Sequence, residues 1–167
     1  AIAFSMVVFP SFSILQDQPG RLRESFERVL QVAAMVCMPI GFGILAVAPE
    51  FVRVILGERW QGIALTMQIL SVMGIAKALE GTANSLLMAV GRPGLLMGFS
   101  SLQLFVLAVT LYPLTLRWGI AGAASAVTLT ALVATAAALV AAVRITELQV
   151  RRILALLAVP LGASTAM

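Results

Sequence analysis

Long stretches without a charged side chain are the feature that most restricts what this chain can fold into. Residues 29–49, 95–116 and 120–143 contain no Asp, Glu, Lys or Arg. A helix rises 1.5 Å per residue, so about 20 residues cross the ~30 Å hydrocarbon core of a bilayer. A helix also satisfies its own backbone hydrogen bonds, which lipid cannot do. The three stretches therefore predict transmembrane α-helices.

Composition extends this prediction to the whole chain. Of the 167 residues, 61% are hydrophobic and 11% are charged, against about 45–50% and about 25% in soluble domains. We therefore expect an all-α, polytopic transmembrane helix bundle. The chain starts at Ala1 and stops at Met167, both within apolar runs. We expect it to be a fragment of a longer membrane protein, forming a single transmembrane region.

Polar breaks divide the chain into four complete and two partial spans. One complete span carries charges inside it and ends at a turn with two glycines and a proline, residues 91–94. Such a turn favours unusual dihedral angles and prevents the helix from continuing. The predicted complete spans are residues 29–49, 63–90, 95–116 and 120–143, and the partial spans are residues 1–15 and 153–167.

Basic residues are distributed unequally between alternate loops. The loops 16–28, 91–94 and 144–152 hold seven of them, and the loops 50–62 and 117–119 hold three. Because cytoplasmic loops are rich in Lys and Arg, the first set is predicted to lie in the cytoplasm. Three aromatic residues fall near the opposite face, as expected of an interfacial belt: Trp60, Tyr112 and Trp118.

Several classes of function are excluded by residue types. His is absent and Cys37 is the single cysteine, which argues against His-based metal sites, Ser-His-Asp triads and an internal disulfide. The turn at 91–94 lacks the Gly-Lys-Ser/Thr spacing of a nucleotide loop. The basic excess fits anionic lipid heads and topology better than nucleic acid. We expect no cofactor, no metal and no nucleic-acid partner.

Two opposite charges near the middle of the predicted span 63–90 are the leading candidate site. Lys77 and Glu80 are one helical turn apart, and they share a face with Gly74, Gly81 and Asn84. A charge at bilayer depth costs several kcal/mol (about 2.5–3.5 on insertion scales), so it is rarely kept without a use or a partner. Lys77 would attract a pyrophosphate or sugar acid, and Glu80 would exchange a proton or bind a cation. A purely structural ion pair is the alternative, and for Asn84 it is an interhelical hydrogen bond.

Two further features have both a functional and a structural interpretation. Arg21, Arg23 and Arg28 are candidate contacts for lipid heads at the cytoplasmic mouth, or plain determinants of topology. Pro39 lies at the centre of the span 29–49. A proline removes one helical hydrogen bond, so this position is a candidate hinge or a fixed kink.

Three segments in order resemble a known family. FPSFSIL occupies residues 9–15 and is followed by a short polar loop and a span with a central proline; LGERW occupies residues 56–60, and LLMAVGR occupies residues 86–92. Their order and spacing resemble the C-terminal half of Wzx-type polysaccharide flippases. That superfamily also holds lipid II flippases and multidrug MATE exporters. The resemblance implies that the chain covers roughly helices 8 to 13 of a fourteen-helix, two-lobe transporter.

This resemblance also implies a function, which is transport and not catalysis. The expected cargo is an isoprenoid pyrophosphate-linked oligosaccharide, such as an O-antigen, capsule or exopolysaccharide unit. It would be flipped from the cytoplasmic to the outer leaflet of the bacterial inner membrane by alternating access. Coupling to protons or sodium stays open. Membrane lipids, a glycan polymerase and glycosyltransferases are the expected partners, and a MATE-type exporter of cations or the membrane scaffold of a glycan-assembly enzyme are the alternatives.

Overall fold

The computed structural model describes residues 19–91 and 93–146, which form long helices joined by tight turns. A π-helical turn and a 3₁₀ turn connect the first two long helices, and residues 90 and 91 form a turn after the second. The elements in order are α2 (Pro19–Phe51), η1 (Val52–Leu56), η2 (Glu58–Trp60), α3 (Gln61–Ala89) and α4 (Pro93–Thr146).

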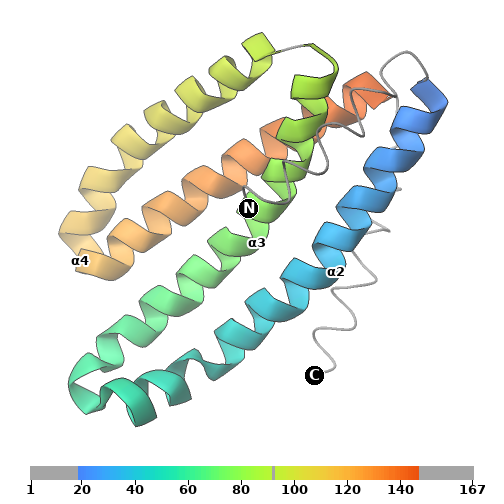
Figure 1. Cartoon of the computed structure of the whole chain (residues 1–167). Coiled ribbons are helices and arrows are strands. Elements are labelled where there is room, and N and C mark those ends of the chain that lie inside the picture. Colours follow the sequence, from blue (N-terminus) through green and yellow to red (C-terminus); the bar gives the residue numbers. More distant parts are fainter. Residues whose placement is uncertain (1–18, 92, 147–167) are drawn as a thin grey trace.

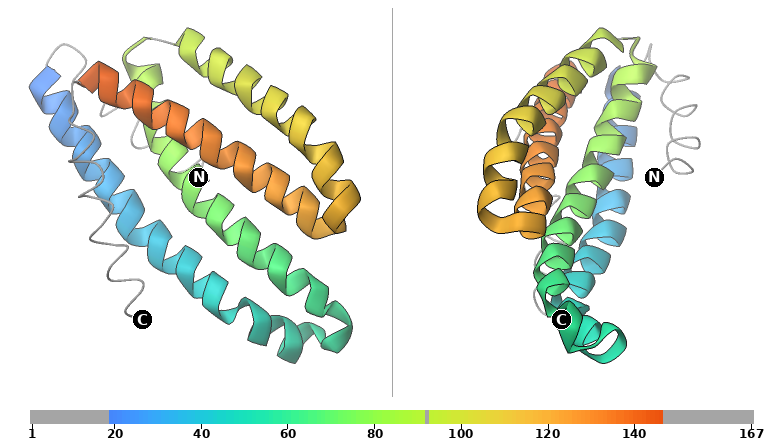
Figure 2. Two further views of the ribbon diagram at one scale, coloured as in Figure 1. Left: turned by 180° about the vertical axis from the view of Figure 1, so that it is seen from behind. Right: turned by 90° about the vertical axis from the view of Figure 1, so that its left-hand side faces the viewer.

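The helix α3 is the central element of the bundle. It runs antiparallel to α2 and contacts both α2 and α4, whereas α2 and α4 barely touch (Figure 1). The helix α4 is a hairpin of two arms, and its second arm lies between its first arm and α3 in both face views (Figure 2). The order across the bundle is therefore α2, α3, second arm, first arm.

The helix α2 begins ten residues before the predicted span 29–49, because residues 19–28 are helical too. Leu22, Phe26 and Leu30 recur every four residues on this part of the helix and are buried. This stripe continues through Ala34 and Met38 and packs in one core with Leu79, Ala83 and Leu86 of α3. The charged residues fall on the other faces, so the polar segment predicted as a loop is an amphipathic extension of the helix.

A side chain of α3 repairs the backbone of α2 near its second proline. In a helix the carbonyl of Leu45 would accept from the N–H of residue 49, which is Pro49 and has no N–H. The side-chain amide of Gln68 donates to this carbonyl at 2.9 Å instead. Within a membrane, neighbouring helices commonly satisfy backbone groups freed by proline. This hydrogen bond fixes the axial position of α2 on α3.

Gly119 reverses the chain inside α4. Its φ of 56° and ψ of −130° are not helical, so the element consists of two helices, residues 93–118 and 120–146. A side chain at this φ would be strained, which explains why glycine serves here. Just beyond the turn, a Cβ on Gly122 would collide with the carbonyl of Leu114 in the first arm. The two arms therefore touch backbone to backbone near the turn.

The second arm of α4 is buried on two sides, which accounts for its high content of alanine and threonine. One face carries Gly122, Ala126 and Thr130, all of them buried, on the side of the first arm. The other face packs on α3, where the hydroxyls of Thr128 and Thr135 lie 3.2 and 3.0 Å from the carbonyls of Ile69 and Ala76. Small residues permit such close approach of helices in membranes.

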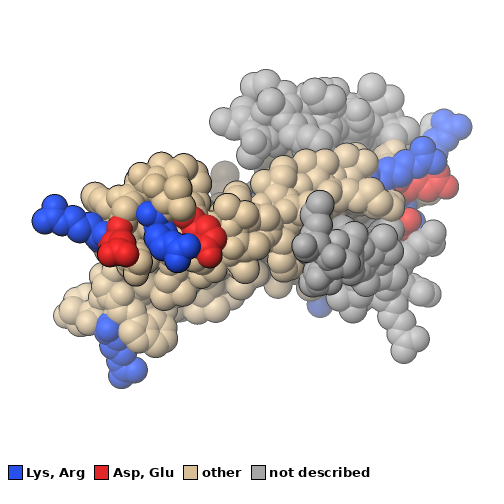
Figure 3. Space-filling view, turned by 90° about the horizontal axis from the view of Figure 1, so that it is seen from below, with Lys and Arg blue, Asp and Glu red and all other residues tan. Residues whose placement is uncertain are grey.

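The predicted fold class is confirmed: the described residues form an all-α membrane helix bundle. Three of their helices are long and apolar enough to cross a membrane, within Gly20–Leu56, Glu58–Ala89 and Gly94–Ile145. In the space-filling view, charged side chains gather towards the two ends of the molecule (Figure 3). The predicted partial spans 1–15 and 153–167 lie outside the described residues.

Candidate functional site

The two charges predicted for mid-membrane lie in direct contact on α3. The ammonium Nζ of Lys77 is 2.8 Å from Oε2 of Glu80, as their spacing of three residues allows. The carboxylate side chain is only 10% exposed, whereas 41% of the lysine side chain is exposed. The pair is therefore asymmetric, with a buried acid and a partly open base.

Two buried oxygens of this face lack a hydrogen-bond donor. Among the residues that the structure describes, neither Oε2 of Glu80 nor Oδ1 of Asn84 has a hydrogen-bond partner. The contact of Glu80 with Lys77 has the distance of an ion pair but not the geometry of a hydrogen bond. A buried acceptor without a donor costs about 1–3 kcal/mol. Buried polar groups are nearly always satisfied. Oε2 of Glu80 is compensated by the ammonium of Lys77 at 2.8 Å, so Oδ1 of Asn84 is the oxygen on this face that needs a donor.

The neighbouring hydroxyls of α3 do not supply that donor. Thr82 donates to the carbonyl of Ala78 at 3.3 Å, and Ser85 donates to the carbonyl of Gly81 at 2.9 Å. Both hydroxyls thus turn back onto their own helix, the usual behaviour of Ser and Thr inside helices. The hydroxyls of Thr82 and Ser85 therefore donate no hydrogen bond to the side-chain oxygens of Glu80 and Asn84.

The position of Glu80 along the bundle follows from the pairing of α3 with the second arm of α4. Two hydrogen bonds join residues that are 59 positions apart, Thr128 with Ile69 and Thr135 with Ala76. Glu80 is one turn beyond Ala76, so it belongs to the same side of α3. The second arm presents small buried residues here, including Ala134 and Ala138, and Ala138 packs in one core with Leu79 and Ala83 of α3.

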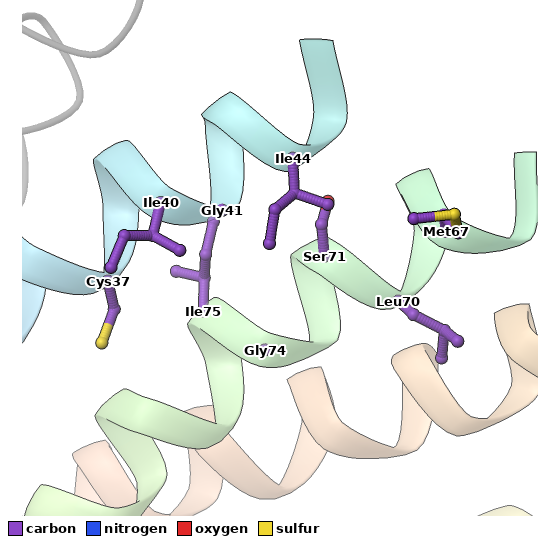
Figure 4. Close-up of a pocket in the computed structure, with 9 residues that line it drawn as sticks. All are labelled: Cys37, Ile40, Gly41, Ile44, Met67, Leu70, Ser71, Gly74 and Ile75. Carbon is purple, nitrogen blue, oxygen red and sulfur yellow. The ribbon is translucent and has the colours of Figure 1, made fainter. Parts of the chain in front are cut away.

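An apolar groove of about 400 Å³ begins one turn before Lys77. It lies between α2 and α3, and Gly74 of the predicted polar face is on its wall (Figure 4). The remaining wall is almost entirely aliphatic, and the hydroxyl of Ser71 donates to the carbonyl of Gln68 at 2.7 Å. The groove therefore offers a hydrophobic surface and little polar chemistry. Its lining residues are Cys37, Ile40, Gly41, Ile44, Met67, Leu70, Ser71, Gly74 and Ile75.

The three arginines predicted to meet lipid heads do not form one cluster. Arg21 and Arg28 are exposed and seven residues apart, so they share a face at the start of α2. Arg23 lies on another face, where its Nε is 3.3 Å from Oε1 of Glu27. Within the described residues, Arg23 takes part in an ion pair, whereas Arg21 and Arg28 take part in none.

Pro39, the candidate hinge, lies within the continuous helix α2. Two residues further on, Gly41 is buried against Ile75 of α3, where an added Cβ would overlap the isoleucine side chain. Residues near the proline are therefore tightly packed on one side. No group of three or more Cys, Asp or Glu that could hold a metal ion occurs among the described residues.

Comparison with known proteins shows two kinds of similarity. A family model described as "Polysaccharide biosynthesis protein" matches residues 2–65. An uncharacterized membrane protein in the cps region of Klebsiella pneumoniae is 33% identical over 118 residues, which is 71% of this chain and 24% of that protein. No solved structure gives a significant match.

Two other relatives carry more specific names. The lipopolysaccharide biosynthesis protein WzxC of Escherichia coli is 32% identical over 100 residues, which is 60% of this chain and 20% of that protein. The teichuronic acid biosynthesis protein TuaB of Bacillus subtilis is 29% identical over 119 residues, 67% of this chain and 25% of that protein. The matches with these relatives span a quarter of their length or less.

Proposed function

Because this chain belongs to the Wzx-type membrane proteins of polysaccharide biosynthesis, as its motifs predicted, we propose that it is part of a lipid-linked oligosaccharide flippase. The cargo is an isoprenoid pyrophosphate-linked glycan unit, moved from the cytoplasmic to the outer leaflet of the inner membrane by alternating access. In this proposal the chain belongs to one lobe of a fourteen-helix protein, and the loops 16–28, 91–94 and 144–152 face the cytoplasm. The glycosyltransferases and polymerase of the same glycan act before and after it.

The observation that carries this proposal is a buried acceptor without a donor close to a buried ion pair. In the described part of the chain Oδ1 of Asn84 has no hydrogen-bond partner, and Oε2 of Glu80 has the ammonium of Lys77 at 2.8 Å. Sugar hydroxyls are donors of the kind these oxygens accept. The ammonium of Lys77 is a mobile point charge suited to phosphate oxygens. Together the three side chains match a molecule that is both hydroxylated and anionic.

Transient binding follows from the same arrangement. Lys77 contacts Glu80 at 2.8 Å, which lowers the cost of holding either charge at this depth. An arriving pyrophosphate competes with Glu80 for the ammonium of Lys77. Sugar hydroxyls then donate hydrogen bonds to the carboxylate of Glu80 and replace the lost ion pair. A proton or cation on Glu80 would also release Lys77. Cargo binding and ion binding are therefore linked through one carboxylate.

Export assays with the full-length protein test this proposal. In a strain that lacks the gene, Glu80→Gln and Lys77→Ala should each abolish surface polysaccharide while protein levels stay normal. Glu50→Gln is the matched control, because Glu50 forms an exposed ion pair with Arg53 at the same spacing of three residues. That control should export normally. Full export by both single variants would contradict the proposal.

A double variant separates a transport role from a structural one. Lys77→Met combined with Glu80→Met removes both charges, so that no buried charge is left unpaired. If the pair only stabilises the fold, the double variant should export as the wild type does. The proposal requires that it accumulates normally in the membrane and exports nothing.

The same strains test the alternative of a MATE-type exporter of cations. A buried carboxylate such as Glu80 is the group that a cationic compound would need. In that case expression should raise resistance to cationic dyes, Glu80→Gln should remove the resistance, and surface polysaccharide should not depend on the protein.

A further inference from the structure

A second hollow lies at the end of the bundle where η2 meets the turn of α4. It has a volume of about 310 Å³ and combines two segments that are almost sixty residues apart in the sequence. Lys77 is about 24 Å further along α3 at 1.5 Å per residue, so this hollow is separate from the candidate transport site. Its lining residues are Arg59, Trp60, Gly62, Ile63, Trp118, Ile120 and Ala121.

The guanidinium of this hollow is available for a ligand. Arg59 is exposed, and within the described ranges it takes part in no ion pair. The nearby Arg53 differs, because its Nη2 is 3.5 Å from Oε2 of Glu50 and it does not line the hollow. A free guanidinium presents a planar fork of donors that matches phosphate oxygens.

Two indole rings and several aliphatic side chains line the same hollow as Arg59. Trp60 is 52% exposed and Trp118 is 66% exposed, one from each of the two segments. Ile63 and Ala121, which also line the hollow, are half-buried. Indoles favour the depth of lipid headgroups, where the ring is partly apolar and the N–H can donate. The lining thus combines a cationic side chain with aromatic and aliphatic ones, which suits an amphiphilic ligand.

We propose that this hollow binds the headgroup of an anionic phospholipid. Arg59 holds the phosphate, the rings of Trp60 and Trp118 flank the glycerol, and the first acyl carbons lie over Ile63 and Ile120. An interfacial aromatic belt alone would explain the two indoles. It requires neither a hollow shared by two distant segments nor an arginine left without an acidic partner. The lipid would join η2 to the turn of α4 and so stabilise this end of the bundle.

Lipid titration of the purified full-length protein tests the proposal. In detergent micelles, dioleoyl phosphatidylglycerol should raise the midpoint temperature of unfolding more than dioleoyl phosphatidylcholine, which has the same chains. Arg59→Gln should raise the phosphatidylglycerol concentration for half of this shift about tenfold or more, the loss expected for a charge-assisted hydrogen bond. Arg53→Gln is the matched control and should behave as the wild type.

Four outcomes would overturn it. They are an equal shift with phosphatidylcholine, an unchanged titration for Arg59→Gln, the same shift from soluble glycerol 3-phosphate, and an equal loss in Arg53→Gln. The second would mean that the indoles hold a neutral ligand such as a sugar, and the third that phosphate suffices without a lipid tail. If Arg59→Gln does not fold, Arg59→Lys and native mass spectrometry replace it, and fewer bound phosphatidylglycerol molecules in that variant are then required.

Discussion

At the scale of single residues, the sequence reveals isolated charges but not the partners of uncharged polar groups. Lys77 and Glu80 are evident because they interrupt an apolar span, and their contact follows from their spacing. The donation from Gln68 to the carbonyl of Leu45 could not be predicted, since it depends on how two helices are aligned. Pro49 is the only local signal that this carbonyl needs a donor.

Replacing Asn84 should separate stability from transport. Its Oδ1 is buried without a donor in the part of the chain that the structure describes, so Asn84→Leu should raise the free energy of unfolding by about 1 kcal/mol. Export should fall, because a contact for the cargo is lost. Thr82→Val is the control, since that hydroxyl only bonds its own helix, and its export should be normal. A destabilised Asn84→Leu would instead assign Asn84 an interhelical hydrogen bond.

Gln68 should stabilise the protein only as long as residue 49 is proline. Gln68→Leu leaves the carbonyl of Leu45 without its donor, and should lower the free energy of unfolding by about 0.6–2 kcal/mol. Pro49→Ala restores a backbone N–H at this position, so the same change should cost much less in that background. Unfolding of the four proteins in a denaturing detergent measures the difference, and equal losses in both backgrounds would refute the explanation.

At the scale of elements, hydropathy locates helices well and their ends poorly. The predicted spans 29–49, 95–116 and 120–143 fall within α2 and the two arms of α4, and the predicted span 63–90 ends one residue beyond α3. The segment 16–28 was predicted as a loop, but its residues 19–28 are helical, because burial of Leu22 and Phe26 outweighs the local polarity. The reversal at Gly119 takes a single residue. Its direction depends on backbone contact between the arms, which hydropathy does not report.

Gly122 should be essential for closing the α4 hairpin, and Gly98 should not. A Cβ on Gly122 collides with the Leu114 carbonyl, whereas one on Gly98 meets nothing within 4 Å. Gly122→Ala should lower the free energy of unfolding by about 1–3 kcal/mol, as overpacking does. Gly98→Ala should be neutral or stabilising by up to about 1 kcal/mol, because alanine favours helix. Thermal unfolding of both purified variants is the measurement, and equal effects would argue against the close contact.

At the scale of the whole molecule, most charges lie near the ends of the helices, and Lys77 and Glu80 are the exception within α3. The start of α2 carries Arg21 and Arg28, and the opposite end carries Arg53 and Arg59. The sequence predicted which end is cytoplasmic from the number of basic residues in alternate loops. It could not predict that α3 is the central helix, because the order of neighbours is set by which surfaces fit together.

Cysteine labelling should reveal the orientation. In full-length protein with Cys37 replaced by Ala, a cysteine at Glu58 should react with a membrane-impermeant maleimide from the periplasmic side. A cysteine at Gly20 should react only after the inner membrane is opened. Both positions are exposed, so accessibility within the protein does not limit the reaction. The reverse pattern would invert the predicted topology.

The two threonine bonds between α3 and the second arm of α4 limit how this lobe can change shape. Both hydrogen bonds join residues that are 59 positions apart in the sequence. Sliding one helix along the other by a single turn would therefore break both. Each hydroxyl also lies 2.7–2.8 Å from a carbonyl of its own helix, so its single proton is shared between two acceptors. Each hydrogen bond between the helices is therefore weak, but there are two of them. We therefore expect α3 and the second arm of α4 to move together as one rigid body. Any opening of a passage has to occur along their flanks, on the α2 side or against the first arm.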